Sequence, residues 1–254
     1  MVIRKALYAG SFYPSGATQL ESMLKKILLD NKPNLKKLKI SPKTIKAIIV
    51  PHAGYVYSGI TASFAYNALS KTKKRKIILI GPSHHEALQG IYCFNSEWVT
   101  PIGKTKALPL QEVPVIENDS EHSLEVQLPF LQTIFSEFEF FPLLYGDISC
   151  EKISEILAPL SIESIIIASS DLSHFMPYEQ AKIMDNITID AILSLDIKTL
   201  KEKGNACGLI GIIALCLLAK KFNWKPVLLD YKNSGDMSGN KKGVVGYASI
   251  IFTQ

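Results

Sequence analysis

Ile45-Lys46-Ala47-Ile48-Ile49-Val50 is an apolar run that leads directly into Pro51-His52-Ala53-Gly54. A short apolar run that stops at Pro and Gly is typical of a buried strand followed by a tight loop. The same arrangement recurs at Ile77–Ile80, before Gly81-Pro82-Ser83-His84-His85, and at Ile165–Ala168, before Ser169-Ser170-Asp171-Leu172-Ser173-His174. These stretches predict strands of one sheet, each ending in a polar loop that carries histidine.

The rest of the chain alternates strands with helices. Apolar runs predict further strands at Phe138–Leu144, Ser164–Ser169, Val227–Tyr231 and Val244–Phe252. Helical spacing of apolar residues predicts helices at Gln19–Leu29, Thr61–Leu69, Ser123–Phe135, Glu179–Leu193 and Leu209–Ala219. This alternation indicates an α/β fold with a central, mostly parallel or mixed sheet flanked by helices. Because no Pro/Gly linker or repeat divides the chain, we expect a single domain over residues 1–254, with Gly90–Pro109 as a β-excursion.

The composition is that of an ordinary globular protein. Apolar residues make up 47% of the 254 residues and charged residues 20%. No apolar run approaches the roughly 18 residues of a membrane span. The N-terminus lacks an apolar segment followed by a small-residue cleavage site, so we expect a cytoplasmic protein with no membrane partner. The four cysteines show no Cys-x-x-Cys spacing and are expected to be reduced thiols.

The net charge of +5 comes largely from two lysine-rich stretches, Lys32–Lys46 and Lys71–Lys76. A nucleic-acid-binding surface usually gathers such charges on one face with aromatic residues among them. Both stretches flank expected helices and strands, and neither contains an aromatic residue. We therefore expect a solvated rim and no nucleic-acid partner.

The histidines that follow the expected strands, His52, His84, His85 and His174, predict a ligand-binding crevice. The carboxyl ends of parallel strands meet at one edge of an α/β sheet, where functional groups collect. Two or three imidazoles with one anionic ligand would bind zinc, iron or copper. Adjacent side chains diverge, so only one member of the pair His84-His85 is expected to bind the ion. The alternative is that each histidine is a hydrogen-bonded turn residue.

Further polar residues stand just before the third expected helix. Asn118 or Ser120 would cap that helix at its N-terminus. Glu121 and Glu125 lie four positions apart and would share one face. His122 points either into the crevice or back into the helix as a hydrogen-bonded cap residue, and the sequence leaves both alternatives open.

Cys207 precedes an apolar helix in the stretch Gly204-Asn205-Ala206-Cys207-Gly208. A thiol at a helix N-terminus lies near the positive end of the helix dipole, which favours the thiolate. A thiolate would serve as a metal ligand or as a nucleophile, whereas many lone cysteines in this position only pack against their neighbours. The sequence contains no Gly-x-Ser-x-Gly elbow, P-loop, Gly-x-Gly-x-x-Gly fingerprint or His-Glu-x-x-His helix.

Six motifs, taken in order, resemble those of the Memo family. They are Ala9–Pro14, Val50–Tyr55, Gly81–His85, Glu121–Glu125, Ser169–Asp171 with His174, and Cys207-Gly208. Each motif is short, but together they span nearly the whole chain with plausible gaps. The resemblance implies a fold similar to that of class III extradiol dioxygenases.

Those dioxygenases bind Fe(II) with two histidines and a carboxylate, and a further histidine acts as acid or base. The resemblance implies that His52 and His84 bind the metal, with Cys207 in the place of the third ligand. His174, with Asp171 near it, matches the acid/base position. Because a thiolate is softer than a carboxylate, the expected cofactor is one transition metal, iron or copper first and zinc as the alternative.

Supporting roles in this site are expected for four residues: His85, His122, Glu121 and Glu125. Two positions depart from the family pattern. Phe12 stands where animal members have tryptophan beside the cleft, and Leu209 follows the Cys-Gly pair where Memo proteins carry a basic residue nearby. These departures weigh against carrying over the phosphotyrosine-peptide binding ascribed to animal members.

The sequence leaves three functions open. The first is a metal-dependent redox enzyme that acts on a small substrate, aromatic compounds included, with His174 moving a proton. The second is a non-catalytic binding module that recognises a peptide or a partner protein in the same cleft. The third is a metal-free hydrolase or thiol enzyme built on Cys207. The resemblance also implies a radical-SAM protein as a partner in microbial members.

Overall fold

Four parallel strands form the centre of the sheet in the computed structural model, which describes residues 2–117 and 120–254. In spatial order they are β2 (Ile45–Val50), β8 (Ser164–Ser169), β3 (Lys76–Pro82) and β7 (Glu139–Tyr145). Antiparallel strands extend it, namely β11 (Val244–Thr253) and β10 (Lys225–Asn233) beyond β2, β4 (Ile91–Cys93) beyond β7, and β9 (His174–Met176) beside β11. The sheet is therefore mixed, with its parallel part at the centre.

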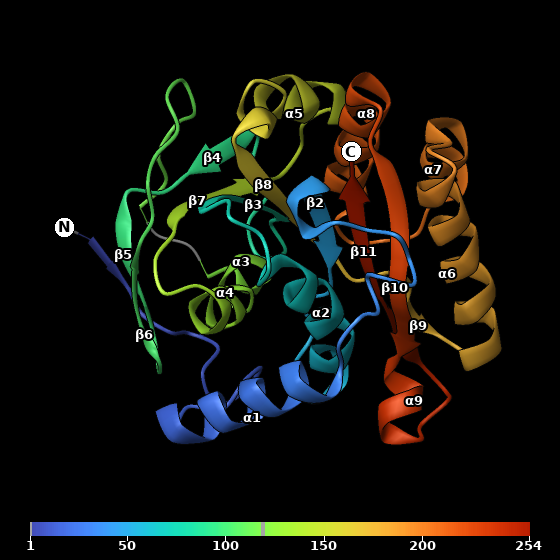
Figure 1. Cartoon of the computed structure of the whole chain (residues 1–254), viewed down its shortest axis with the longest axis horizontal. Coiled ribbons are helices and arrows are strands. Elements are labelled where there is room, and N and C mark those ends of the chain that lie inside the picture. The colour runs from blue at the N-terminus through green and yellow to red at the C-terminus, as the bar shows by residue number, and fades with distance from the viewer. Residues whose placement is uncertain (1, 118–119) are drawn as a thin grey trace.

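Helices cover both faces of this sheet (Figure 1). One face carries α1 (Ala17–Asp30), α2 (Tyr55–Leu69) and α4 (Leu128–Ile134), and the other carries α5 (Cys150–Leu157), α6 (Tyr178–Leu193), α7 (Ile197–Lys203) and α8 (Leu209–Phe222). Alternate residues of a central strand enter the two cores, since Ile48 and Val50 face the first set of helices and Ala47 and Ile49 the second. A strand buried on both faces is apolar along most of its length, as in β2, where only the partly buried Lys46 near its start is charged.

Each strand and helix expected from the sequence is present, but one helix is divided. The helix expected at Ser123–Phe135 forms two pieces, α3 (His122–Glu125) and α4. Pro129 explains the division, because it lacks the N–H that would bond to the carbonyl of Glu125 and its ring would clash with that carbonyl. The break turns the short α3 toward the carboxyl edge of the sheet.

The segment Gly90–Pro109 forms the expected β-excursion. It contains β4, β5 (Ser96–Thr100) and β6 (Gly103–Lys106). The last two make a separate three-stranded sheet with β1 (Val2–Arg4), in the order β1-β5-β6. The short α9 (Ser234–Ser238), which the sequence did not predict, fills the connection between β10 and β11.

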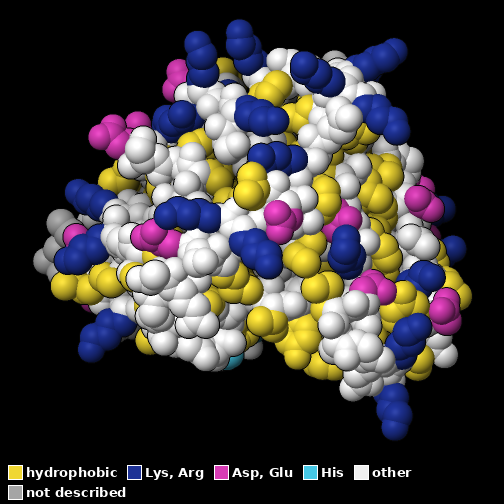
Figure 2. Space-filling view, turned by 60° about the horizontal axis from the view of Figure 1, so that its bottom comes forward, with side chains coloured by type: hydrophobic (Ala, Val, Ile, Leu, Met, Phe, Trp, Pro, Cys, Tyr) yellow, Lys and Arg dark blue, Asp and Glu magenta, His cyan; other side chains and the backbone are white. Residues whose placement is uncertain are grey.

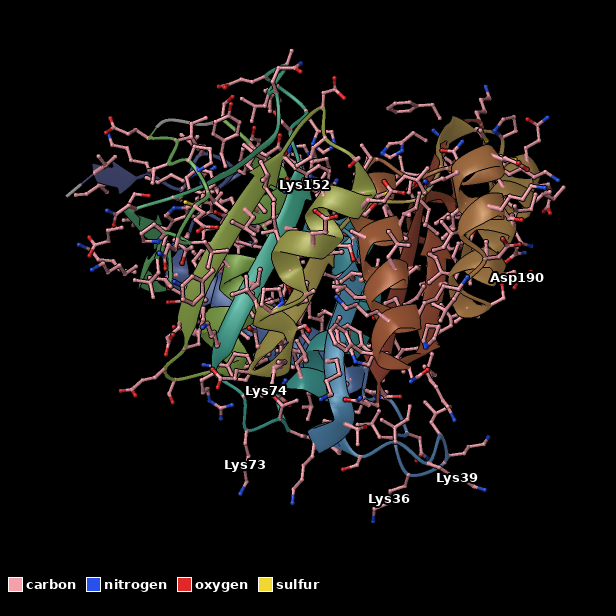
Figure 3. All side chains as sticks on the ribbon, turned by 90° about the horizontal axis from the view of Figure 1, so that it is seen from above. Lys36, Lys39, Lys73, Lys74, Lys152 and Asp190 are labelled. Carbon is pink, nitrogen blue, oxygen red and sulfur yellow. The ribbon has the colours of Figure 1, made fainter. Side chains whose placement is uncertain are left out.

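The lysine-rich stretches lie where β2 and β3 begin, at the edge opposite the histidine loops. Lys36, Lys39 and Lys73 extend outward from that edge (Figure 3), whereas Nζ of Lys74 donates to the carbonyls of Ile162 and Ser164. On the face shown in Figure 2, Lys and Arg side chains are interspersed with Asp, Glu and apolar side chains. Within residues 2–117 and 120–254, no helix combines the length and the apolar character needed to cross a membrane.

Candidate metal centre

Three histidines from separate loops meet at the carboxyl edge of the parallel strands. His52 lies between β2 and α2, His84 follows β3, and His122 begins α3. Each offers a ring nitrogen, and the three nitrogens lie within 4.8 Å of one another. The Sγ atom of Cys207 lies 3.1 Å from Nε2 of His52, so a thiol lies beside these histidines, although among the described residues its sulfur is not one of the ligand atoms that all lie within 4.8 Å of one another. Imidazoles and a thiol are donors that zinc, copper and iron accept.

Hydrogen bonds fix the tautomer of the buried His52. Ser169 Oγ donates its one hydrogen to the carbonyl of Ser123 (2.6 Å) and accepts one from Nε2 of Gln127 (2.8 Å). Its remaining lone pair faces Nδ1 of His52 at 3.0 Å, so Nδ1 must donate. Tyr66 donates to Oε1 of Gln127 (2.7 Å) and thereby fixes the amide orientation. Nε2 of His52 therefore presents its lone pair to the cluster.

Glu121 orients His84 in a similar way. Its carboxylate accepts hydrogen bonds from Nδ1 (2.9 Å) and the backbone N–H (2.5 Å) of His84 and from the N–H of Ser123 (2.8 Å). Burial opposes ionisation, but these hydrogen bonds outweigh it and lower the pKa of Glu121 to about 2. An ionised carboxylate only accepts, so Nε2 of His84 is left free for a metal. The same residue caps α3 in place of Ser120, whereas Asn118 lies outside the described residues.

His122 points into the cluster, which settles the alternative that its sequence position left open. Its ring centroid lies 4.7 Å from that of His84 and 5.2 Å from that of His52. Its buried Nδ1 lies 3.1 Å from Oε1 of Glu121, yet in the described part of the chain it is not aligned for a hydrogen bond. Burial lowers the pKa of His122 to about 4 and that of His52 well below its usual range. Both imidazoles are therefore neutral at pH 7, as metal binding requires.

His85 belongs to an aromatic rim beside the cluster. Its Nε2 lies 3.0 Å from the hydroxyl of Tyr8, which itself donates to the carbonyl of Ser120. The phenol oxygen must then accept from Nε2 of His85. His85, Glu121 and His122 form a second group whose ligand atoms lie within 4.8 Å of one another. Because Glu121 already accepts three hydrogen bonds, the group formed by His52, His84 and His122 fits a metal better than the group that contains Glu121.

Glu125 holds the N-terminal segment, residues 4–14, against the site. This buried carboxylate pairs with the guanidinium of Arg4 and accepts hydrogen bonds from the N–H of Tyr8 (2.8 Å) and the hydroxyl of Tyr13 (2.6 Å). The segment between these tyrosines carries Phe12, whose ring centroid lies 4.9 Å from that of His122. Glu125 therefore acts at a distance from the cluster, by placing an aromatic wall beside it.

Cys207 packs against the turn that follows β8. Its Sγ accepts a hydrogen bond from the N–H of Asp171 (3.2 Å), and its own N–H donates to the Asp171 carbonyl (3.2 Å). Burial, with the nearby Asp171 carboxyl, raises the pKa of the thiol to about 12. The helix dipole is thus outweighed, and the thiolate expected from the sequence does not form in the metal-free protein. The close packing requires glycine at position 208, where a Cβ would lie 2.7 Å from Cβ of Ser170.

Asp171 and His174 both line a cavity of about 380 Å³ beside the cluster. Oδ1 of Asp171 accepts a hydrogen bond from the backbone N–H of His52 at 2.8 Å, so this carboxyl positions the His52 loop. No hydrogen bond joins it to the His174 ring among the described residues. Burial raises the pKa of Asp171 to about 7 and lowers that of His174. Groups perturbed in this way at a cavity are typical of functional sites.

Two residues that position His52, Gln127 and Ser169, received no role from the sequence. Ser169 stands within the motif Ser169–Asp171, but its contact with Nδ1 of His52 arises only when β2 and β8 pair. Gln127 carried one detectable signal, because it is a polar residue between Val126 and Leu128 in an apolar helical pattern. A buried amide in such a place needs polar partners.

The fold and the cluster define an α/β protein with a candidate metal centre built from strand-end loops. The family profile described as Memo-like protein matches residues 4–251. A MEMO1 family protein of Thermoplasma volcanium is 36% identical over an alignment of 271 positions, gaps included, which covers 98% of each chain. Another, from Sulfurisphaera tokodaii, is 36% identical over an alignment of 282 positions, gaps included, which covers 99% of each chain. The chain therefore belongs to the Memo family, as its motifs predict.

Among solved structures, an uncharacterised protein of Escherichia coli K12 is similar to this chain with a TM-score of 0.48. The match covers 82% of this chain and 99% of that one, at 12% sequence identity. A similarity this remote carries no argument about function. The function therefore has to be argued from the residues of the site.

Proposed function

We propose that this Memo-family protein binds one transition metal through His52, His84 and Cys207 and acts as a metal-dependent redox enzyme on a small substrate. The convergence of His52, His84 and His122 at one edge of the sheet, with the thiol of Cys207 beside His52, carries the proposal. The centre would resemble that of an extradiol dioxygenase in which a thiol replaces the carboxylate ligand. His122 would support the site, since it faces the same point.

The donor set fits a transition metal. Nε2 of His52 and Nε2 of His84 are both available, because Ser169 and Glu121 occupy the two Nδ1 atoms. A sulfur ligand beside imidazoles suits iron, copper or zinc. A bound metal would supply Lewis acidity and, as iron or copper, redox capacity.

His174 is the residue we propose as acid or base. It lines the cavity that a substrate would occupy, and burial favours its neutral form. A neutral imidazole accepts a proton from a bound substrate and later returns it. Asp171 instead supports the metal centre, because its carboxyl accepts a hydrogen bond from the backbone N–H of His52 and so positions that ligand.

Metal analysis of anaerobically purified protein tests this function. We expect about one iron or copper per chain, as a single three-ligand site predicts. His52→Ala and His84→Ala should each abolish stoichiometric metal, whereas His122→Ala should weaken binding by about 10–100-fold, as loss of a supporting residue does. Cys207→Asp should retain metal but shift its preference from copper toward iron, since a carboxylate is the harder ligand.

The alternative is a binding module that uses the same cleft without turnover. Wild-type protein that purifies without metal, and that remains inactive with oxygen and small aromatic compounds after loading, would favour this alternative. The radical-SAM partner implied by the resemblance and the peptide ligand of the binding-module alternative both stay predictions.

A further inference from the structure

The cavity beside the metal centre has one aromatic wall and one neutral polar wall. The aromatic residues are Phe12, Tyr57 and Tyr247, and the neutral polar residues are Ser234, Ser238 and Asn240. Its titratable imidazoles and carboxyl belong to His122, His174 and Asp171. Lys and Arg are absent from the described residues that line it. At about 380 Å³, the cavity lies within the range of small-molecule sites, toward the small end.

The two walls come from segments that are far apart in the sequence. The N-terminal segment supplies Phe12 and the first turn of α2 supplies Tyr57. The polar wall comes from α9 and from the loop that leads to β11. Asn240 Oδ1 accepts the N–H of Lys242 (3.1 Å), and its Nδ2 donates to no group in the ranges that the structure describes. This amide therefore has donors available for a ligand.

The charges around the cavity disfavour an anionic ligand. In the protein without metal, a negative group placed there would lose water without gaining a Lys or Arg side chain from the described lining, which is costly. Lys241 and Lys242 stand between the lining residues Asn240 and Gly243, but neither lysine lines the cavity. Nζ of Lys241 lies 4.5 Å from the ring centroid of Tyr178, which does not line the cavity either.

We infer that this cavity takes a small aromatic compound that carries no negative charge. Its ring would pack against Phe12 and Tyr57, and a hydrogen-bond acceptor on it would meet Nδ2 of Asn240. The inference names the substrate class of the proposed function and rests on that function for the presence of a metal nearby. The recognition itself depends only on protein side chains, so it can be tested without metal.

Three compounds of nearly equal shape separate charge from size: benzamide is neutral, benzamidine is cationic and benzoate is anionic. Their dissociation constants are measured by calorimetry or NMR titration on the full chain after metal is removed with a chelator. We expect benzamide and benzamidine to bind at least tenfold more tightly than benzoate. Benzoate meets no cationic side chain in the described lining, whereas the amidinium of benzamidine meets hydrogen-bond acceptors such as the hydroxyls of Ser234 and Ser238. Benzoate binding as tightly as benzamide, or no measurable binding of benzamide, would overturn the inference.

Two matched pairs of variants locate the ligand. Asn240→Arg adds a cation to the polar wall and should tighten benzoate at least tenfold, whereas Asn240→Gln should leave the order of the three compounds unchanged. Phe12→Ala should weaken benzamide at least fivefold, and Ile183→Ala, an exposed site on α6, should not. Unchanged benzoate affinity in Asn240→Arg would contradict this placement.

Failure of the proposed function and failure of this inference give different results. If the protein binds no metal yet prefers benzamide over benzoate, the enzyme proposal is wrong and the inference about the ligand class stands. A chain that holds metal through His52 and His84 but prefers benzoate keeps the metal centre and loses the ligand class.

Discussion

His52 and His84 each present Nε2 because a hydrogen bond occupies Nδ1, but the two partners differ in kind. The partner of His52 is the neutral hydroxyl of Ser169, and the partner of His84 is the ionised carboxylate of Glu121. A carboxylate partner raises the basicity of an imidazole. We therefore expect His84 to be the stronger metal ligand of the two. Metal binding by His52 depends instead on the hydrogen bonds of Ser169 and Gln127 that orient its ring.

Removing the hydroxyl of Ser169 tests the tautomer of His52. In the wild-type protein without metal, ¹⁵N NMR should show hydrogen on Nδ1 of His52, because Ser169 Oγ has no other hydrogen to offer. Ser169→Ala should populate the other tautomer and weaken metal binding by about 10–100-fold, as loss of an orienting partner does.

Ser63→Ala is the matched control, since it also removes a buried hydroxyl, one that bonds to the carbonyl of Ile60 within α2. It should change neither the NMR signature of His52 nor the metal affinity. Hydrogen found on Nε2 of His52 in the wild-type protein would contradict the proposed network.

Metal binding should release a proton from Cys207. The thiol has a pKa of about 12 without metal, whereas the neighbouring imidazoles are already neutral at pH 7. Binding requires the thiolate, so affinity should rise by about tenfold per pH unit between about pH 8 and pH 9.5, above the pKa of Asp171 and below that of the thiol. Calorimetry in buffers of different ionisation enthalpy measures the released proton.

Cys207→Ala supplies the control for this proton release, because it removes the thiol and retains the histidines. Its residual affinity should be nearly independent of pH over the same interval. An equal pH dependence in Cys207→Ala and in the wild type would show that Cys207 does not bind the metal.

Among the structural elements, the N-terminal segment lies directly beside the site. It carries Phe12 to the cavity, and a single buried carboxylate on α3, that of Glu125, accepts hydrogen bonds from Arg4, Leu7, Tyr8 and Tyr13 along it. Arg4 also lies over the ring of Trp98, with Cζ 4.2 Å from the ring centroid. Through Arg4, the three-stranded sheet is therefore attached to α3.

Breaking this contact should be strongly destabilising. Glu125→Ala leaves the buried guanidinium of Arg4 without its carboxylate partner, and breaking a buried ion pair in this way costs about 3–5 kcal/mol of the free energy of unfolding. Denaturant unfolding measures the loss. Lys104→Ala, which breaks the more exposed pair with Glu97 on the same small sheet, should change stability by no more than about 1 kcal/mol.

If Glu125→Ala and Lys104→Ala cost the same, Glu125 does not anchor the segment. The double variant Arg4→Met with Glu125→Gln should recover part of the lost stability, because it removes both buried charges. A double variant that is less stable than Glu125→Ala would indicate that Arg4 contributes mainly through Trp98.

In the whole molecule, the sheet brings together groups that are far apart in the chain. His52, His84, His122 and Cys207 come from four connections and lie at one edge because β2, β8 and β3 run parallel. The lysine-rich edge lies at the opposite ends of the same strands (Figure 3). A metal at the cluster would therefore join loops from both ends of the sequence.

A bound metal should stabilise the entire fold. A ligand that binds only the folded state at a hundred times its dissociation constant stabilises it by about 2.7 kcal/mol. For a chain of about this size, that corresponds to a rise in Tm of about 5–11 °C. Differential scanning calorimetry with and without a chelator measures the shift. His52→Ala should show no shift, and an equal response of this variant to metal would place the binding site elsewhere.

The amino-acid sequence by itself predicted the α/β class, the central strands and the Memo family. Strands such as Ile45–Val50 can be recognised in the sequence because burial on both faces makes nearly every residue apolar, Lys46 excepted. It also identified His52, His84 and Cys207 as candidates, because functional groups collect in loops at strand ends. The division of the helix at Pro129 was missed because its apolar spacing continues across the break.

Only the tertiary structure decided how the candidate side chains are arranged. The direction of His122, the tautomer of His52 and the raised pKa of Cys207 depend on partners distant in the sequence. Local patterns report the helix dipole at Cys207 but not the burial that outweighs it. The charge of the cavity likewise required the fold, because its walls come from both ends of the chain. Periodicity specifies which face of an element is buried, whereas long-range packing sets hydrogen-bond partners and the environment of each titratable group.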